Sequence, residues 1–300
     1  MPSVQPAIWP LSRLVIFDCD STLVTVEGID ELARLISEES NISSRQNPQH
    51  EDIAIQIASL TKRAMEGELP LETIYGLRLT TINPTQSQVR QIASIYRQAI
   101  VSDAVQVISA LKNAGILVFI VSGGMIEPVQ EFGNWLGISS DRIYAVDIQY
   151  DQLSGRWWRY WDQPYGLNTS ASYLAHGTGP LTDTKGKNRI IAHIRAENPG
   201  RTLLVGDGLT DLEAGEEVDL FIGFGGVKQR EIVALQAPVY IKSPFLSPIL
   251  PLALGQAGNI PYFSNLWADG IRRINAGEVS FRDLEMQTLF FNALRRPGSS

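Results

Sequence analysis

Short apolar segments alternate with longer amphipathic segments over most of the chain beyond residue 103. The apolar segments are rich in branched side chains, which is typical of buried strands. Beyond residue 103 they lie at 116–121, 143–146, 202–205, 220–222 and 239–241, and a further one lies near the N-terminus at 13–17. Between them, apolar residues recur at helical spacing at 104–115, 128–136 and 190–194. This alternation predicts an α/β fold with a Rossmann-like, doubly wound parallel sheet and helices on both faces.

The segment 27–97 differs because its apolar residues recur only at helical spacing. Two such series are Ile53, Ile57, Leu60 and Ala64, and then Val89, Ile92, Ala93 and Tyr96. The polar stretch 43–52 predicts a loop between helices. We therefore expect a helical cap domain of three to five helices at 27–97, inserted into an α/β core made of 1–26 and 98–242.

Two further segments fall outside the alternation. Residues 147–161 predict a β-hairpin flap, whose aromatic run 156–161 packs against the core or, alternatively, stacks on bases. Residues 168–179 are rich in Ser, Thr and Gly and predict an extended loop. Residues 243–300 form a C-terminal extension to which the sequence assigns no role beyond a helix near 281–294.

Composition narrows the class of partner. The net charge of −7 argues against broad binding to nucleic acid, which needs a basic face. A single cysteine excludes an internal disulfide and fits a reducing compartment. The N-terminus has no signal-peptide pattern, and the apolar stretch 244–255 is too short to span a bilayer. We expect a cytoplasmic protein that binds a small molecule and neither nucleic acid nor membrane.

Four groups of polar residues each follow a predicted strand or begin the helix next to one. They are Asp18 with Asp20, the segment 122–124 (SGG), Lys185 in TKGK, and the segment 206–211 (GDGLTD). Ligands of parallel sheets gather at the carboxyl ends of the strands. This set suits phosphoryl transfer, in which a carboxylate attacks phosphorus while Mg²⁺, backbone N–H groups, a hydroxyl and a lysine bind the phosphoryl oxygens.

The spacing suggests individual roles. Asp18 and Asp20 lie on one face of an extended segment, and two carboxylates there need a cation. Asp207 supplies a further metal carboxylate, and Asp211, one helical turn later, could orient Lys185 or a metal-bound water. Each motif alone also has an ordinary interpretation as a cap, a turn or a solvated helix start. Their joint occurrence favours the chemistry.

The segments DCDST, SGG, TKGK and GDGLTD resemble, in order, the four motifs of the haloacid dehalogenase superfamily of phosphotransferases. Three more segments resemble the phosphoserine phosphatase family within it: VEGIDELA at 26–33, LTKRAMEG at 60–67 and FIGFGG at 221–226. The resemblance covers residues 13–242.

The resemblance implies a role for each matching residue. Asp18 is the nucleophile, Asp20 the general acid and base, and Lys185 a further catalytic residue. The phosphate-binding residues are Ser122, Gly123, Lys185 and Thr210; the Mg²⁺ ligands are Asp18, Asp20 and Asp207, with Asp211 behind them. Glu27 faces a substrate ammonium and Arg63 a carboxylate, although Glu27 could instead favour the helix start and Arg63 could be a solvated charge beside Lys62.

The expected protein is therefore a Mg²⁺-dependent phosphomonoesterase that hydrolyses O-phosphoserine through an aspartyl-phosphate, as in serine biosynthesis. One alternative is the same chemistry on another small phosphate ester, such as a sugar phosphate. Another is a non-hydrolytic binding or scaffolding protein with a relict pocket. The intact set of catalytic residue types favours the enzyme.

Overall fold

The computed structural model describes residues 9–43, 55, 57, 59–60, 62–63, 71–158, 169–183 and 185–295. Its strands are β1 (Leu14–Phe17), β2 (Leu117–Met125), β3 (Ile143–Val146), β4 (Ile148–Asp151), β5 (Ser172–His176), β6 (Thr202–Gly206), β7 (Leu220–Phe224), β8 (Val239–Ile241) and β9 (Val279–Phe281). Its helices are α1 (Gly28–Ser43), α3 (Leu71–Ile82), α4 (Gln86–Gln98), α5 (Ala104–Asn113), α6 (Ile126–Trp135), α7 (Gly186–Glu197), α8 (Leu209–Ala214), α9 (Glu231–Gln236), α10 (Ile249–Leu254), α11 (Ser264–Asn275) and α12 (Leu284–Leu294). Among the residues described, no helix has the length and apolarity that a membrane span requires.

A seven-stranded sheet confirms the predicted α/β class. Its strand order is β3-β2-β1-β6-β7-β8-β9. The pairs β2–β3, β1–β6, β6–β7 and β7–β8 are parallel, as the alternation of strands and helices predicts. The sheet also contains β9, a strand that the sequence did not predict, and β9 pairs antiparallel with β8. Its three residues (VSF) have a polar side chain at the centre, so β9 lacks the continuous apolar run by which the other strands were predicted.

The chain forms two compact units, and each consists of several segments. Unit 1 comprises Met1–Asp18, Val101–Phe119 and Ile191–Ser300, and unit 2 comprises Cys19–Ile100 and Ile120–Ile190. In unit 1 every residue of β1 is fully buried, as are the residues at the centre of its neighbour β6. A strand that is buried on both faces appears in the sequence as a continuous apolar run, which is why β1 could be predicted.

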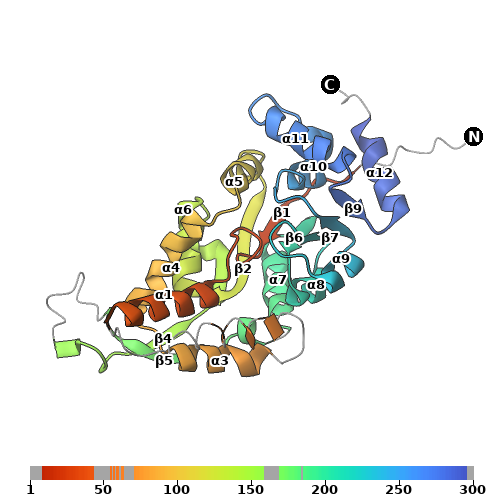
Figure 1. The fold of residues 1–300 in the computed structure, drawn as a ribbon. Coiled ribbons are helices and arrows are strands. Elements are labelled where there is room, and N and C mark those ends of the chain that lie inside the picture. Colours follow the sequence, from red (N-terminus) through yellow and green to blue (C-terminus); the bar gives the residue numbers. More distant parts are fainter. Residues whose placement is uncertain are drawn as a thin grey trace, which may run out of the picture. The chain divides into compact units, whose positions relative to one another are not determined.

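The C-terminal extension is part of the core of unit 1. Its helices α10, α11 and α12 gather beside β9 (Figure 1). Asp103 accepts hydrogen bonds from the backbone N–H groups of Leu246 (2.9 Å) and Ser247 (2.8 Å). At the other end of the unit's sequence, the Trp9 ring meets the ring of Phe290 edge-on, with centroids 5.0 Å apart. The extension therefore covers the edge strand β8 and buries apolar side chains of the unit.

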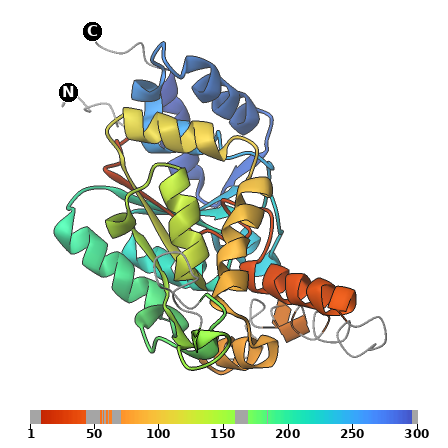
Figure 2. The same cartoon turned by 90° about the vertical axis from the view of Figure 1, so that its left-hand side faces the viewer.

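Unit 2 includes α1, α3 and α4, three helices of the segment in which the sequence predicts a helical cap, together with residues 120–190, which the sequence assigned to the core. Helix α4 begins with a capping box between Thr85 and Gln88, and it lies alongside α6 in both views (Figures 1 and 2). Its buried face is the predicted series of Val89, Ile92, Ala93 and Tyr96. Ile57 of the other series is buried too. The predicted loop at 43–52 falls almost wholly outside the described residues, as do Ile53 and Ala64.

The β-hairpin flap is present, but its second strand is not where the sequence placed it. Strand β4 pairs antiparallel with β5, which lies inside the stretch 168–179 that the sequence predicted as a loop. Backbone bonds from Gln86 N to Ala171 O (3.0 Å) and from Tyr173 N to Pro84 O (2.7 Å) tie this segment to the α3–α4 connection. Trp157 and Trp158 are about half exposed, so the prediction that the aromatic run packs against the core is wrong for these two.

Candidate active site

In unit 1, Asp18 follows the last residue of β1. The register between β1 and β6 pairs Phe17 with Val205, and the Asp18 N–H donates to the Val205 carbonyl over 2.9 Å. Strand β6 then ends at Gly206, and Asp207 follows. Because the two strands are parallel, their carboxyl ends carry both aspartates to one edge of the sheet.

Asp18, Asp207 and Asp211 form a cluster of buried carboxylates. One oxygen of each lies within 4.8 Å of the others. Three buried carboxylates repel one another strongly unless a cation lies among them, and carboxylate oxygens are the ligands that Mg²⁺ prefers. The cluster therefore fits a divalent cation. The cluster includes Asp211, which the sequence predicted to support the metal ligands and not to be one of them. The predicted role of Asp20 as a metal ligand stays a prediction.

Asp211 is held in this cluster by the turn at the start of α8. Its Oδ2 accepts a hydrogen bond from the Gly208 N–H over 3.1 Å. Its Cγ lies only 2.2 Å from the point where a Cβ on Gly206 would stand. Glycine is therefore required at 206 because any side chain there would displace the carboxylate. The neighbouring Thr210, predicted to bind phosphate, is half-buried in the first turn of α8.

Arg230 is a member of this half of the site that the sequence did not predict. Its Nε donates to Asp207 Oδ2 over 2.9 Å, and both side chains are largely buried. Arg230 precedes α9 in a loop with no motif of its own, and one arginine in a polar loop gives no signal of burial. The ion pair places a fixed positive charge beside the carboxylate cluster.

In unit 2, Asp20 and Ser122 converge on Gly124. A Cβ on Gly124 would lie 3.2 Å from Ser122 Oγ and 3.4 Å from Asp20 Oδ2. The Gly124 N–H donates to Ser122 Oγ over 3.0 Å. Strand β2 continues through this segment to Met125, whereas the sequence ended the strand at Val121. The pairing with β3 shifts register between Val121 and Met125, so the strand is irregular where the predicted phosphate-binding residues Ser122 and Gly123 lie.

The loop after β1 positions Glu27. Ser21 adopts a left-handed backbone conformation (φ +54°), and its Oγ donates to Glu27 Oε1 over 2.6 Å. Glu27 is buried, and its carbonyl accepts the N–H groups of Asp30 and Glu31 at the start of α1. Glu27 therefore lies at the start of helix α1, which is the structural role that the sequence offered for it. Its carboxylate is also buried.

A buried tyrosine lies beside Asp20. Burial raises the pKa of Tyr96 well above its ordinary value, and the negative charge of Asp20 raises it further. The hydroxyl lies against Gly28, where a Cβ would come within 2.1 Å of it. The sequence identified Tyr96 only as part of an apolar helix face, because periodicity carries no information on what a hydroxyl contacts.

The two lysines of TKGK differ in environment. Lys185, the predicted phosphate-binding residue, has an exposed side chain, and its N–H donates to Asp183 Oδ1 over 3.3 Å. Lys187, two residues later, is buried. Gly186 separates them, and a Cβ there would overlap the Pro180 carbonyl, which explains the glycine. The role of Lys185 stays a prediction, and Lys187 is a second cation of the same segment.

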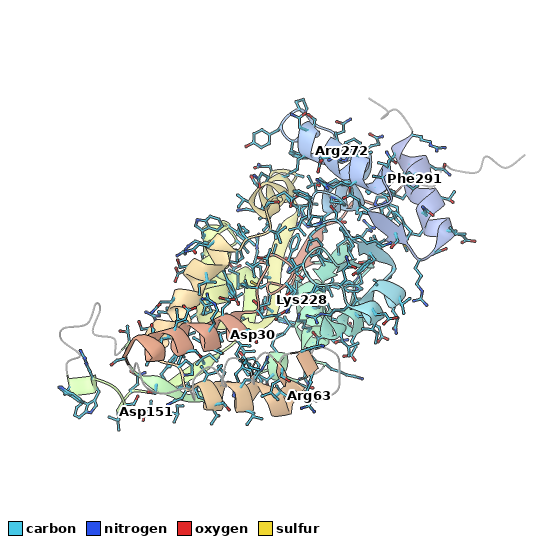
Figure 3. All side chains as sticks on the ribbon, in the orientation of Figure 1. Asp30, Arg63, Asp151, Lys228, Arg272 and Phe291 are labelled. Atoms are coloured by element: carbon cyan, nitrogen blue, oxygen red, sulfur yellow. The ribbon has the colours of Figure 1, made fainter. Side chains whose placement is uncertain are left out.

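Two arginines of unit 2 are candidates for binding an anion. Arg63, the residue that the sequence named, is exposed; it is labelled in Figure 3. Arg78 on α3 is only 4% exposed. Burial lowers the pKa of Arg78, and the negative charges of Asp30, Glu27 and Asp20 oppose that effect. Arg78 is an isolated cation on a largely apolar helix, which is a sequence signal of a buried charge that was overlooked.

Comparison with known proteins points to one family and one fold. A model of the haloacid dehalogenase-like hydrolases matches residues 12–219. The chain is 32% identical to the phosphoserine phosphatase of Drosophila melanogaster, over 80% of this chain and 78% of the relative. It is 29% identical to that of Rattus norvegicus, over 76% and 88% of the two chains. A solved structure of a phospho-aspartyl intermediate analogue of phosphoserine phosphatase shares the fold, with a TM-score of 0.62 at 24% identity, over 80% of this chain and 98% of that one.

Proposed function

The chain belongs to the haloacid dehalogenase-like hydrolases, and we propose that it hydrolyses O-phosphoserine to serine and phosphate. The observation that carries the proposal is the buried cluster of Asp18, Asp207 and Asp211, whose geometry suits a cation and a carboxylate nucleophile. The choice of ester is supported by the phosphoserine phosphatases to which the chain is similar.

Asp18 is the proposed nucleophile. Its carboxylate oxygen forms a bond to phosphorus while the bond from phosphorus to the serine oxygen breaks, which gives an aspartyl-phosphate. Asp20 donates a proton to the departing oxygen. Asp20 then accepts a proton from the water that attacks the same phosphorus, and the Asp18 carboxylate is released with phosphate. Asp18 ends unit 1 and Asp20 follows two residues later in unit 2, so the chain itself keeps the two groups near each other.

The remaining polar groups bind the phosphoryl oxygens or the metal. We assign the phosphoryl oxygens to Ser122, Gly123, Thr210 and Lys185, which supply hydroxyl, backbone and ammonium donors. Asp18 and Asp207 would hold Mg²⁺, with Asp20 and Asp211 as further oxygen donors. When bound, the ion neutralises charge on the carboxylates and the phosphate.

Recognition of the serine part requires one anionic and one cationic group. Glu27 is the proposed partner of the substrate ammonium, since Ser21 fixes its buried carboxylate. For the substrate carboxylate we propose Arg78 instead of Arg63. Arg78 is buried, and the negative charges of Asp30, Glu27 and Asp20 act on its guanidinium, whereas Arg63 is exposed. A desolvated guanidinium binds a carboxylate far more strongly than a solvated one does.

Phosphate release in the presence of Mg²⁺ tests the proposal. We expect the wild type to release phosphate from O-phosphoserine with a higher kcat/KM than from phosphothreonine or sugar phosphates. Asp18→Asn should abolish release, and EDTA should abolish it reversibly. A large preference for a sugar phosphate would assign the same chemistry to a different ester. Full activity of Asp18→Asn would contradict the mechanism.

We also propose that the protein is cytoplasmic, as its sequence predicts. Cys19 is the only cysteine in the sequence and its side chain is buried, so the chain cannot form an internal disulfide. Fractionation of the native host cell with detection of the protein tests this location directly.

A further inference from the structure

Tyr75 is a buried tyrosine that no part of the proposed mechanism uses. It lies on α3, one turn before Arg78, and is 3% exposed. Its ring packs against the ring of His176 with centroids 5.2 Å apart, and Arg78 Cζ lies 5.8 Å from the Tyr75 ring centroid. Within the part of the chain that the structure describes, its hydroxyl has no hydrogen-bond partner.

Such a hydroxyl destabilises the protein when it has no ligand. A buried O–H without a partner loses its hydrogen bonds to water and gains none in return, so nearly all buried polar groups are paired. A phenylalanine would give the same ring packing without that loss. A ligand that accepts a hydrogen bond from this hydroxyl would explain why residue 75 is a tyrosine and not a phenylalanine.

The charges around Tyr75 indicate the kind of ligand. Burial raises the pKa of Tyr75, so the hydroxyl is protonated at neutral pH and can donate. The positive charge of Arg78 opposes this rise, and the negative charge of Asp20 adds to it. Asp20, Arg78 and Tyr75 all belong to unit 2, and Arg78 Cζ lies 5.8 Å from the centroid of the Tyr75 ring. A donor beside a buried guanidinium suits an anion that has more lone pairs than the guanidinium can satisfy.

We propose that Tyr75 donates a hydrogen bond to the carboxylate of the substrate, alongside the ion pair with Arg78. This inference rests on the proposed function and adds a specificity-determining residue to it. A substrate without the carboxylate would leave both Tyr75 and Arg78 without their partner. A site built in this way rejects analogues that lack the group more strongly than an apolar pocket can. Tyr75 therefore favours phospho-amino acids over simple phosphate esters.

Tyr75→Phe and a matched variant, Tyr173→Phe, test the proposal. The Tyr173 hydroxyl is close by but already bonds His176 Nδ1 over 2.9 Å. With O-phosphoserine, Tyr75→Phe should raise KM about tenfold, the size expected for a hydrogen bond to a charged group, with kcat little changed. With O-phosphoethanolamine, which lacks the carboxylate, kcat/KM should stay within about twofold of wild type. Tyr173→Phe should leave both substrates unaffected.

The melting temperature distinguishes a role in substrate binding from a purely structural role. If the Tyr75 hydroxyl stabilised the fold, its removal would lower the melting temperature. Without ligand, Tyr75→Phe should melt at the same temperature as wild type or a few degrees higher, because the variant loses an unpartnered buried hydroxyl. A lower melting temperature, or equal losses of kcat/KM on both substrates, would overturn the proposal. An unchanged KM for O-phosphoserine would overturn it too.

The test of Tyr75 can be separated from the test of the proposed function. If the wild type releases no phosphate from O-phosphoserine, the proposed function fails. Tyr75 is then judged by calorimetric titration of O-phosphoserine into Asp18→Asn and into the double variant Asp18→Asn/Tyr75→Phe. About tenfold weaker binding in the double variant supports the inference. Equal binding, or no binding to either protein, overturns it.

Discussion

Arg230 Nε lies 2.9 Å from Asp207 Oδ2, and both side chains are largely buried. The guanidinium is thus a fixed positive charge bonded to one of three clustered carboxylates. In the absence of a metal it offsets part of their mutual repulsion, so the stability of unit 1 and its response to Mg²⁺ are coupled through this pair.

Arg230→Met should destabilise the metal-free protein by about 3 kcal/mol, because it removes the guanidinium that forms an ion pair with a buried carboxylate. Mg²⁺ should restore part of that loss, since the more negative cluster gains more from a cation. The measurement is the melting temperature in EDTA and in Mg²⁺. The difference between the two should be larger for the variant than for wild type.

Arg97→Met is the control for this prediction. Its partner Glu131 lies 2.9 Å away, but both side chains are substantially exposed. The loss should be below about 1 kcal/mol and independent of Mg²⁺. An equal response of Arg230→Met and wild type to Mg²⁺ would show that the buried pair and the metal site are independent.

Gly206→Ala should damage the carboxylate cluster without changing any charge. The added Cβ would lie 2.2 Å from Asp211 Cγ, so this carboxylate must move. We expect a loss of about 1–3 kcal/mol in unfolding free energy and a fall in kcat/KM on the order of 100-fold. Gly179→Ala is the matched control, because no heavy atom of the described residues lies within 4 Å of its Cβ position. Wild-type kinetics in Gly206→Ala would contradict the role given to Asp211.

Gly28→Ala should clash with Tyr96, whose hydroxyl would be 2.1 Å from the new Cβ. We expect destabilisation of about 1–3 kcal/mol, measured by urea unfolding. Tyr96→Phe removes the clashing oxygen, so Gly28→Ala should cost at most about half as much in that background. Additive losses in the double variant would mean that the glycine is required for another reason.

The pKa of Asp269 predicts an acid-sensitive contact in the C-terminal extension. Partial burial raises the pKa, but hydrogen bonds from Arg273, Ser247 and Arg272 outweigh it and bring the pKa to about 2. Because the folded pKa lies below the unfolded value, this contribution to stability is complete above about pH 5 and is lost as the pH falls from 4 towards 2. Asp269→Asn should therefore flatten the dependence of melting temperature on pH across this window. A slope identical to that of wild type between pH 2 and 5 would refute the assignment.

The sequence could predict the α/β core and half of the site because both depend on local pattern. A buried parallel strand is a short apolar run, and the residue after it lies at the carboxyl edge of the sheet. Asp18 and Asp207 lie where two such runs end, after β1 and after β6, as the sequence predicted. The short strands β5 (SYLAH) and β9 (VSF) were not predicted, because both contain polar residues and neither is a continuous apolar run.

What the sequence by itself determined about this protein is the order of β1, β2, β3, β6, β7 and β8, the helices α5, α6 and α7 between them, and the identity of the groups at the strand ends. Only the tertiary structure decided which charged and hydroxyl groups are buried. Arg63 and Arg78 are the same residue type in the sequence, yet Arg78 is buried and Arg63 is exposed. Only the folded structure shows that the Tyr75 hydroxyl has no hydrogen-bond partner among the described residues. The physical reason is that desolvation and charge pairing depend on neighbours from distant segments, which local periodicity does not encode.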